Sequence, residues 1–159
     1  LGPAPLHIHL GNLIADQGVD EGRLAGADLA EHDYFDAPRF EFLGHALELL
    51  NEAMAHAEKS HARVQLPDIE RLRAEVLLLT GQINTAQAIL RVEQAAALAT
   101  QQGALALEWR ATMALARLYA SVGREHEARE RLRNGYAAFT EGFATPDLVE
   151  GKQLLEGLS

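Results

Sequence analysis

Two stretches of the chain repeat the same pattern of residues before a glycine, and this repeat constrains the fold more than any other feature of the sequence. In 67–81 and in 109–123, a small residue lies seven positions before the final glycine and a large apolar residue lies four positions before it. The residues concerned are Ala74, Leu77 and Gly81 in the first stretch and Ala116, Tyr119 and Gly123 in the second. Residues three, four and seven apart share one face of a helix, and glycine commonly ends a helix. We therefore expect one apolar-faced helix to end at each glycine.

A second apolar stretch follows each of these glycines and completes the repeat. A small residue lies five positions after each glycine (Ala86 and Ala128), and a leucine lies four positions further on (Leu90 and Leu132). The pattern predicts that all four residues are buried: the alanines let the two helices of a hairpin approach closely, and the leucines fill the space between hairpins. Only short loops separate the later helices, so we expect neighbouring helices to be antiparallel.

The composition favours helix along the whole chain. It holds 28 Ala and 26 Leu but only 17 residues of Val, Ile and Thr together. Alanine and leucine are strong helix formers, whereas β-branched residues favour strands. The sequence therefore predicts an all-α protein. The expected helices span 5–17, 38–59, 67–80, 86–102, 104–122, 125–140 and 146–158, with a weak helix over 20–31 and an acidic turn at 32–36.

The repeat resembles the tetratricopeptide repeat, a helix–turn–helix unit of about 34 residues. The matching positions are Leu115, Ala116, Tyr119, Gly123, Ala128 and Leu132. Two positions depart from the family pattern, because Thr112 replaces the usual tryptophan and Gly135 stands where alanine is commoner. The resemblance covers 67–140 and implies antiparallel hairpins stacked as a short right-handed solenoid with a C-terminal capping helix. An ordinary antiparallel helical bundle is the alternative.

A narrower likeness extends over the last two-thirds of the chain. The segments 44–78, 101–111 and 139–148 are similar to the C-terminal repeat region of large bacterial multidomain signalling ATPases of the AAA or STAND type. In such proteins a DNA-binding or nucleotide-cyclase module precedes the ATPase, and the helical repeats follow. The resemblance implies a sensor or scaffold region without enzymatic activity, since the residues of the ATPase and cyclase motifs do not occur in this sequence.

We expect one domain in three parts. Residues 1–66 form an N-terminal hairpin with an acidic insertion at 18–37, residues 67–140 form two repeats, and residues 141–159 form the capping helix. The chain begins with a linker-like segment, which suggests that it is a portion of a longer protein.

Charge and hydropathy exclude several classes of partner. The formal net charge is −9, and residues 1–60 hold 11 acidic and 3 basic residues, whereas 61–159 hold 12 and 11. An acidic protein is poorly suited to a broad nucleic-acid or anionic-membrane surface. No apolar run has the length that a membrane span needs. We therefore expect a cytoplasmic protein without a nucleic-acid or membrane partner, and with a solvated acidic face or a docking surface for a basic partner at its N-terminal part.

The sequence carries no recognisable catalytic motif. It has no cysteine, its three serines lack a nucleophile-elbow motif, and Gly151-Lys152 lacks the rest of a phosphate-binding loop. One cluster could bind zinc, because its members share a face of the 38–59 helix. They are Glu41, His45, Glu48, Glu52 and His56. A solvent-facing stripe is the simpler interpretation, and we expect no enzyme activity, metal or cofactor; a metalloenzyme that uses His45 and Glu52 is a third hypothesis.

The first helices of stacked hairpins line a concave surface, and positions two, five and nine of those helices face it in the repeat register. These positions are Asp68, Arg71 and Glu75 in the first repeat and Arg110, Met113 and Arg117 in the second. The three arginines could together hold a carboxylate or an acidic peptide. Trp109 and Tyr119 are expected in the core.

These features together predict a non-catalytic protein-interaction and regulatory module of a larger bacterial signalling or transcription-regulating ATPase. Its partner in the groove is a protein or peptide, or a neighbouring domain of the same longer chain, and a second copy of the chain is an alternative. A small-molecule effector-sensing helical domain is the alternative function.

Overall fold

The computed structural model describes residues 33–60 and 63–158. The chain divides into two compact units, Leu1–Phe35 and Asp36–Ser159, and nearly all of the described residues belong to the second. The helices expected over 5–17 and 20–31 lie outside the described residues.

The described part of the chain is all-helical, which confirms the all-α prediction, and it contains no strand. The elements are α2 (Asp33–Lys59), the short 3-10 helix η1 (Arg63–Gln65), α3 (Leu66–Leu79), α4 (Thr85–Gln101), α5 (Leu105–Ser121), α6 (Glu125–Ala137) and α7 (Pro146–Gly157). No helix among the described residues is both long enough and apolar enough to cross a bilayer.

The N-terminal boundary of α2 differs from the expectation. An acidic turn at 32–36 followed by a helix from Pro38 was the predicted arrangement, but α2 already begins at Asp33. The turn is therefore wrong over 33–36. Pro38 is the sixth residue of α2, beyond the first turn, which is the usual place for proline in a helix. The rule that proline marks the start of a helix therefore set the boundary too late.

The glycines that end α3 and α5 close both helices in the same way. Gly81 and Gly123 have φ angles of 69° and 77°, a left-handed conformation that glycine adopts without steric cost. The next residue then donates its N–H back to the preceding turn: Gln82 N lies 2.9 Å from Leu77 O, and Arg124 N lies 2.8 Å from Tyr119 O. These bonds satisfy carbonyl groups that the helix end would leave unpaired.

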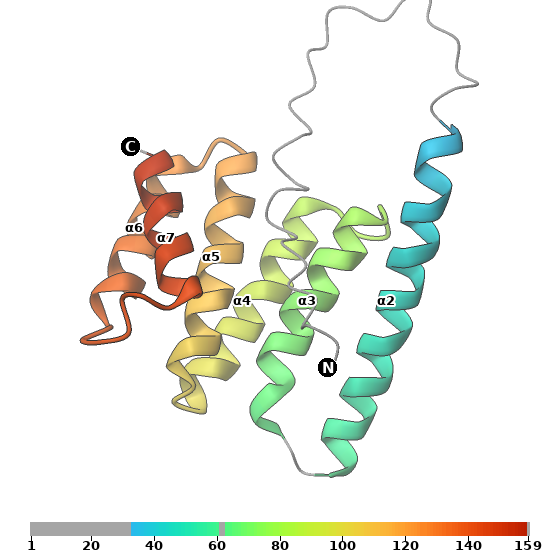
Figure 1. The fold of residues 1–159 in the computed structure, drawn as a ribbon, viewed down its shortest axis with the longest axis horizontal. Helices are drawn as coiled ribbons and strands as arrows, with labels where there is room; N and C mark the ends of the chain where they lie inside the picture. The colour runs from blue at the N-terminus through green and yellow to red at the C-terminus, as the bar shows by residue number, and fades with distance from the viewer. Residues whose placement is uncertain (1–32, 61–62, 159) are drawn as a thin grey trace, which may run out of the picture. The chain divides into compact units, whose positions relative to one another are not determined.

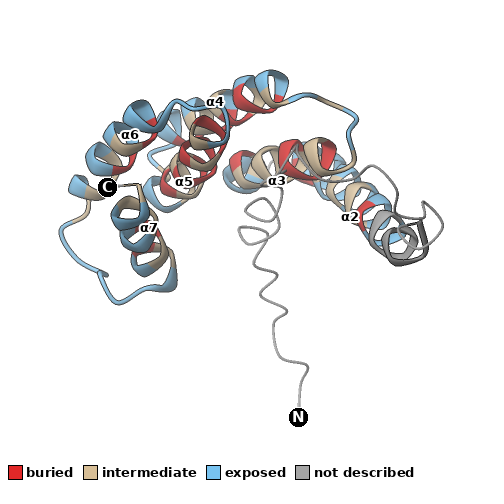
Figure 2. Cartoon of the chain, turned by 90° about the horizontal axis from the view of Figure 1, so that it is seen from above, coloured by how far each residue is buried: buried red, intermediate tan, exposed pale blue. Residues whose placement is uncertain are grey.

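Helices α3, α4, α5 and α6 pack successively, α3 against α4, α4 against α5 and α5 against α6 (Figure 1). Helix α3 also contacts α5, and α7 contacts both α5 and α6. The buried residues lie on the faces that these helices turn toward one another (Figure 2). The core therefore runs through both hairpins rather than within either one alone.

Three of the four small residues of the repeat lie at fully buried positions. Ala74, Ala116 and Ala128 are fully buried, as are Tyr119 and Leu132, so the expected burial of these five residues is confirmed. Alanine permits close approach of two helices because it projects only one methyl group toward the neighbouring backbone.

The first repeat departs from the prediction in its second helix. Ala86 is exposed and Leu90 is 56% exposed, whereas Ala88 and Val92 are fully buried. The expectation that Ala86 and Leu90 are buried is therefore wrong. The correct positions lie two residues later in the chain.

A longer connection explains this shift. Helix α4 begins four residues after Gly81, but α6 begins only two residues after Gly123. The extra residues include Asn84, whose side chain accepts from Gln87 N while the Gln87 side chain accepts from Asn84 N. This capping box fixes the start of α4. Counted from the start of its helix, the buried alanine is the fourth residue in both hairpins, and the buried Val92 or Leu132 is the eighth.

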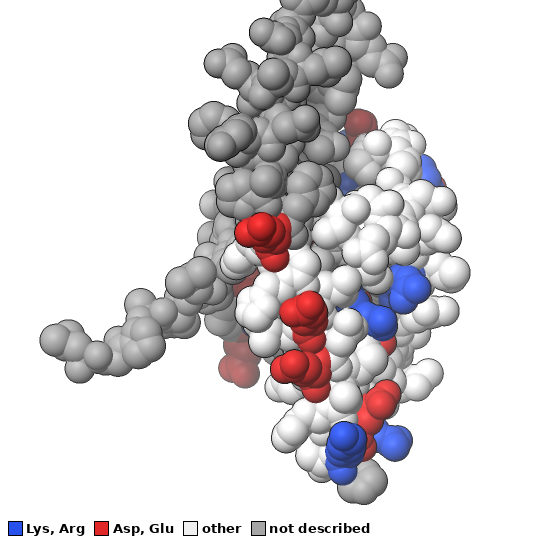
Figure 3. All heavy atoms as spheres, turned by 90° about the vertical axis from the view of Figure 1, so that its right-hand side faces the viewer, with Lys and Arg blue, Asp and Glu red and all other residues white. Residues whose placement is uncertain are grey.

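Acidic side chains gather on the side of the molecule that carries α2 (Figure 3). Glu41, Glu48 and Glu52 on this helix are exposed. These three carboxylates of α2 are therefore presented to solvent.

Candidate interaction face

Five of the six residues predicted to line the groove form a charged face on α3 and α5, which we call the α3/α5 face. Its members are Asp68, Arg71 and Glu75 from α3 and Arg110 and Arg117 from α5. The sixth residue, Met113, is 4% exposed and belongs to the hydrophobic core. Its side chain therefore contributes packing rather than a surface contact.

Arg71 is paired within its own helix. Its Nη2 lies 2.7 Å from Asp68 Oδ1 and its Nη1 lies 2.8 Å from Glu75 Oε1, with only 14% of the side chain exposed. Burial of the guanidinium lowers its pKa, but the carboxylates of Glu75 and Asp68 outweigh burial and leave the pKa above its usual value. Arg71 is consequently a fixed cation whose main hydrogen-bonding directions are already occupied.

Arg110 joins three helices. Its Nη1 lies 3.2 Å from Asp68 Oδ2 on α3, and its Nε lies 2.7 Å from Asp147 Oδ2 on α7. The hydrogen bond to Asp147, acting against partial burial, raises the pKa of Arg110 above its usual value. The guanidinium thus bridges the first hairpin, the second hairpin and the C-terminal helix.

Arg117 makes a second ion pair between α5 and α7. Its Nη2 lies 2.5 Å from Glu150 Oε1 on α7. Asp147 and Glu150 are three residues apart, which places them on one face of α7. Helix α7 therefore turns an acidic face toward the arginines of α5.

Trp109 of α5 also contacts α7 and helps to hold it in place. The indole is 2% exposed, and its Nε1–H donates to the backbone carbonyl of Asp147 over 2.9 Å. Its ring meets Tyr136 and Phe139 edge-on, with centroid separations of 5.9 and 5.8 Å. Such aromatic pairs add stabilisation beyond the apolar area that they bury. The expectation that Trp109 is a core residue is confirmed.

Two glycines leave room for this indole. A side chain at Gly135 of α6 would approach Trp109 Cζ3 to 2.9 Å, and a side chain at Gly151 of α7 would overlap the opposite edge of the same ring. The glycine at 135, where the repeat family more often has alanine, therefore matches the bulk of Trp109. Both helices can lie against the indole only because they lack a side chain at the point of contact.

Arg129 fixes the far end of α7. From α6 it donates to the carbonyl of Leu158, the residue that follows the last turn of α7. A cation at the C-terminus of a helix also interacts favourably with the helix dipole. Helix α7 is thus held at its first turn by Trp109 and Arg110, along its length by Arg117, and at its end by Arg129.

The residue spacing along α3 and α5 predicted that the arginines share one surface, but it did not indicate their partners on α7. The signal that could have indicated them is the Asp-x-x-Glu-Gly spacing of Asp147, Glu150 and Gly151, which puts two acids and a small residue on one side of a helix. The local sequence of α7 is typical of any capping helix, so it does not indicate that this helix packs against the arginines of α5.

The histidine cluster of α2 does not assemble a metal site in the described part of the chain, where no three His, Cys, Asp or Glu side chains come together in a suitable arrangement. His45 Nδ1 lies 3.6 Å from Glu48 Oε2, and both side chains are largely exposed. The pair is a surface contact between neighbouring turns.

The α3/α5 face offers fixed charges and buried carbon surface but no arranged nucleophile and general base. This arrangement can recognise an acidic helix, with charge-assisted hydrogen bonds at two points and a small residue over the indole between them. No protein-family model matches the chain, and comparisons with curated proteins and with solved structures found no significant match.

Proposed function

We propose that this region is a non-catalytic protein-interaction module, and that it captures an acidic helical segment of a partner on the α3/α5 face. The observation that supports this most directly is the pairing of Asp147 with Arg110 and of Glu150 with Arg117. An acidic helix already lies on this face within the chain. A partner helix with the same spacing would make the same contacts after exchange with α7.

The proposal includes the stacked-hairpin architecture. Successive packing of α3 to α6, with buried alanines at equivalent positions of both hairpins, supports a short right-handed solenoid of the tetratricopeptide type. In that arrangement α7 is the capping helix. The regulatory context, a larger bacterial signalling or transcription-regulating ATPase, belongs to the same proposal and is supported by the sequence likeness alone.

Exchange of α7 provides the mechanism of regulation. The acidic helix in the same chain competes at an effective concentration in the millimolar range, so a partner needs higher affinity or a second contact to replace it. Release of α7 would then couple partner binding to the neighbouring domains of the proposed larger ATPase.

The experiment displaces α7 from the α3/α5 face and measures whether a peptide binds there in its place. Gly151→Leu in the full chain introduces a side chain that overlaps the Trp109 ring, while leucine is a better helix former than glycine and leaves α7 itself intact. A fluorescent peptide of residues 144–159 is then titrated, and anisotropy reports binding. We expect the variant to bind the peptide at least about 10-fold more tightly than the wild type, because its own α7 no longer competes.

Matched controls separate docking from general damage. Gly157→Leu lies on the same helix where nothing is within 4 Å of a new side chain, so it should behave as the wild type. A peptide with Lys at positions 147 and 150 should not bind, and Arg117→Glu combined with Gly151→Leu should lose the wild-type peptide. If Gly151→Leu does not fold, Asp147→Lys with Glu150→Lys in the full chain vacates the face by charge repulsion instead. Equal binding of the acidic and the lysine peptides would refute the proposal.

A further inference from the structure

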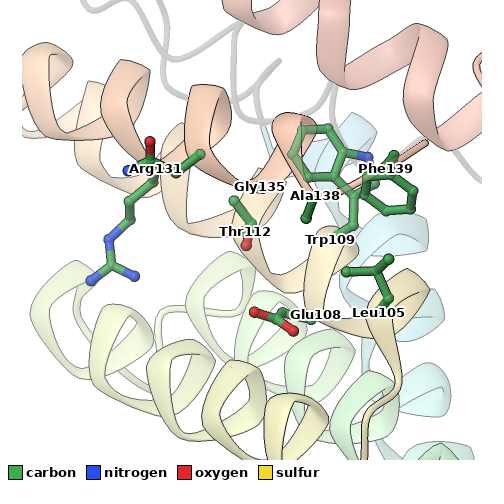
Figure 4. Close-up of a pocket in the computed structure, with 9 residues that line it drawn as sticks. Leu105, Glu108, Trp109, Thr112, Arg131, Gly135, Ala138 and Phe139 are labelled. Carbon is green, nitrogen blue, oxygen red and sulfur yellow. The ribbon is translucent and has the colours of Figure 1, made fainter.

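A cavity of about 270 Å³ lies between α5 and α6 (Figure 4). Ligand pockets in proteins usually span roughly 300–1,000 Å³, so this cavity suits a molecule of amino-acid size. Its lining comes only from the second hairpin, and the α3/α5 face contributes no residue to it.

One end of the cavity is apolar. Leu105, Trp109 and Phe139 line it, and Figure 4 shows them gathered at the same end. The indole is held rigidly by its hydrogen bond to Asp147 and by its edge-on contact with Phe139. A rigid aromatic wall favours an aromatic or branched apolar group, because little side-chain entropy is lost on binding.

The other end carries a preorganised cation. Arg131 Nη2 lies 3.3 Å from Glu93 Oε1, and its guanidinium lies 5.2 Å from the centre of the Tyr119 ring. Tyr119 donates to the same Glu93 oxygen over 2.5 Å. These contacts fix the guanidinium but use only part of its five N–H groups, so it can still bind a carboxylate.

A carboxylate lies between these two ends. Glu108 forms no hydrogen bond or ion pair with another residue that the structure describes. In Figure 4 it lies between the Arg131 guanidinium and Leu105. The cavity therefore presents, in order, a cation, an anion and an apolar wall.

We propose that this cavity binds a free α-amino acid with an aromatic or branched apolar side chain. Its carboxylate pairs with Arg131, its ammonium with Glu108, and its side chain packs against Leu105 and Phe139, next to the buried indole of Trp109. The order of charges in the cavity matches the order of groups along such a molecule. A simple amine or a simple carboxylic acid would leave one of the two charged residues without a partner.

The site is separate from the proposed helix-binding face but touches it through Trp109. One edge of the indole lines the cavity, and the opposite edge contacts Gly151 of α7. Because Trp109 is the only tryptophan in the chain, its fluorescence reports the cavity without a label.

The experiment titrates the full chain with L-phenylalanine and L-leucine, followed by calorimetry and by Trp109 fluorescence. For ligands of this size we expect dissociation constants of roughly 0.1–1 mM. The matched probes are 3-phenylpropionate, which lacks the ammonium group, and 2-phenylethylamine, which lacks the carboxylate. Each should bind at least about 10-fold more weakly than phenylalanine, because one charge-assisted hydrogen bond is lost.

Substitutions test whether Glu108 pairs with the ammonium group of the ligand. Glu108→Gln should weaken phenylalanine binding about 10-fold and leave 3-phenylpropionate unchanged, whereas Glu130→Gln, which does not line the cavity, should change neither. Ala138→Phe should block the cavity, and Ala137→Phe on the neighbouring exposed position should not. The proposal is overturned if no amino acid binds up to 10 mM, roughly a hundred times the stronger expected constant, or if the two analogues bind as well as phenylalanine.

Discussion

The two hairpins α3–α4 and α5–α6 bury equivalent positions but differ in how they use the space around them. At the position fourteen residues before the closing glycine, the first hairpin has Pro67 and the second has Trp109. At the eleventh residue of the second helix, the first hairpin has Ala95 and the second has Gly135, and both are at least half-buried. A larger residue on one helix thus accompanies a smaller one on the other.

The charged side chains differ in the same way. Arg71 of the first hairpin is satisfied by Asp68 and Glu75 of its own helix, whereas Arg110 and Arg117 of the second reach Asp147 and Glu150 of α7. The arginines of the second hairpin therefore contact α7, whereas the arginine of the first hairpin is paired within its own helix. Equivalent folds in a repeat can serve different purposes because only the core positions are shared.

Trp109→Ala should have the largest effect on this comparison. It removes a buried indole that contacts α6 and α7, and we expect the free energy of unfolding to fall by about 3–5 kcal/mol. Urea denaturation followed by far-UV circular dichroism measures the loss. Leu90→Ala, at an exposed position of the first hairpin, should stay within about 0.5 kcal/mol of the wild type. Similar losses in the two variants would contradict the role of Trp109 as an anchor.

Ala88→Leu tests the register of the first hairpin. Three extra carbons at a fully buried position overpack the contact between α3 and α4, at an expected cost of about 1–3 kcal/mol. Ala86→Leu, two residues earlier and exposed, should change stability by less than about 0.5 kcal/mol. Thermal and urea unfolding of the pair give the comparison directly. A larger loss of stability from Ala86→Leu than from Ala88→Leu would show that Ala86 is the buried residue, as the spacing from Gly81 predicted.

Asn84→Ala should have a smaller effect, confined to the start of α4. It removes the side-chain acceptor of the capping box, at an expected cost of about 1 kcal/mol. The equivalent position of the second hairpin is Arg124, which makes no capping hydrogen bond and pairs with Glu127 at the surface, so Arg124→Ala should cost less than Asn84→Ala. Equal losses, measured by the urea midpoint at constant m-value, would show that the two helix starts do not differ.

The smallest effect concerns alkaline pH and Tyr119 in the second hairpin. Burial, together with the hydrogen bond to Glu93, raises the pKa of this tyrosine above its usual value. The stability gained from the protonated hydroxyl is therefore complete below pH about 10, the pKa of tyrosine in the unfolded chain, and is lost as pH rises through the folded pKa. Between pH 8 and pH 11 the urea midpoint should fall further for the wild type than for Tyr119→Phe. An equal fall in both proteins would exclude this contribution.

Much of the fold could be predicted from the sequence. The helix boundaries from α3 to α7 agree with the prediction to within one residue, except that α6 ends at Ala137 and not at 140. The burial of Ala74, Ala116 and Tyr119 also agrees with the pattern around the glycines. The register of α4 could not be predicted from the glycine alone. The capping box of Asn84 starts α4 four residues after Gly81, whereas α6 starts two residues after Gly123. Of the candidate site, the pattern identified the surface arginines, but it put Met113 on the surface with them.

What the sequence by itself determined is local: which residues are helical, where each helix ends, and which face of each helix is apolar. These depend on interactions between residues three to seven apart, which recur within every helix. Only the tertiary structure decided that Asp147 and Glu150 meet Arg110 and Arg117, and that Gly135 and Gly151 lie against Trp109. These contacts join residues 26 to 42 positions apart along the chain, where the spacing of residues no longer states which of many exposed charges and small residues will meet.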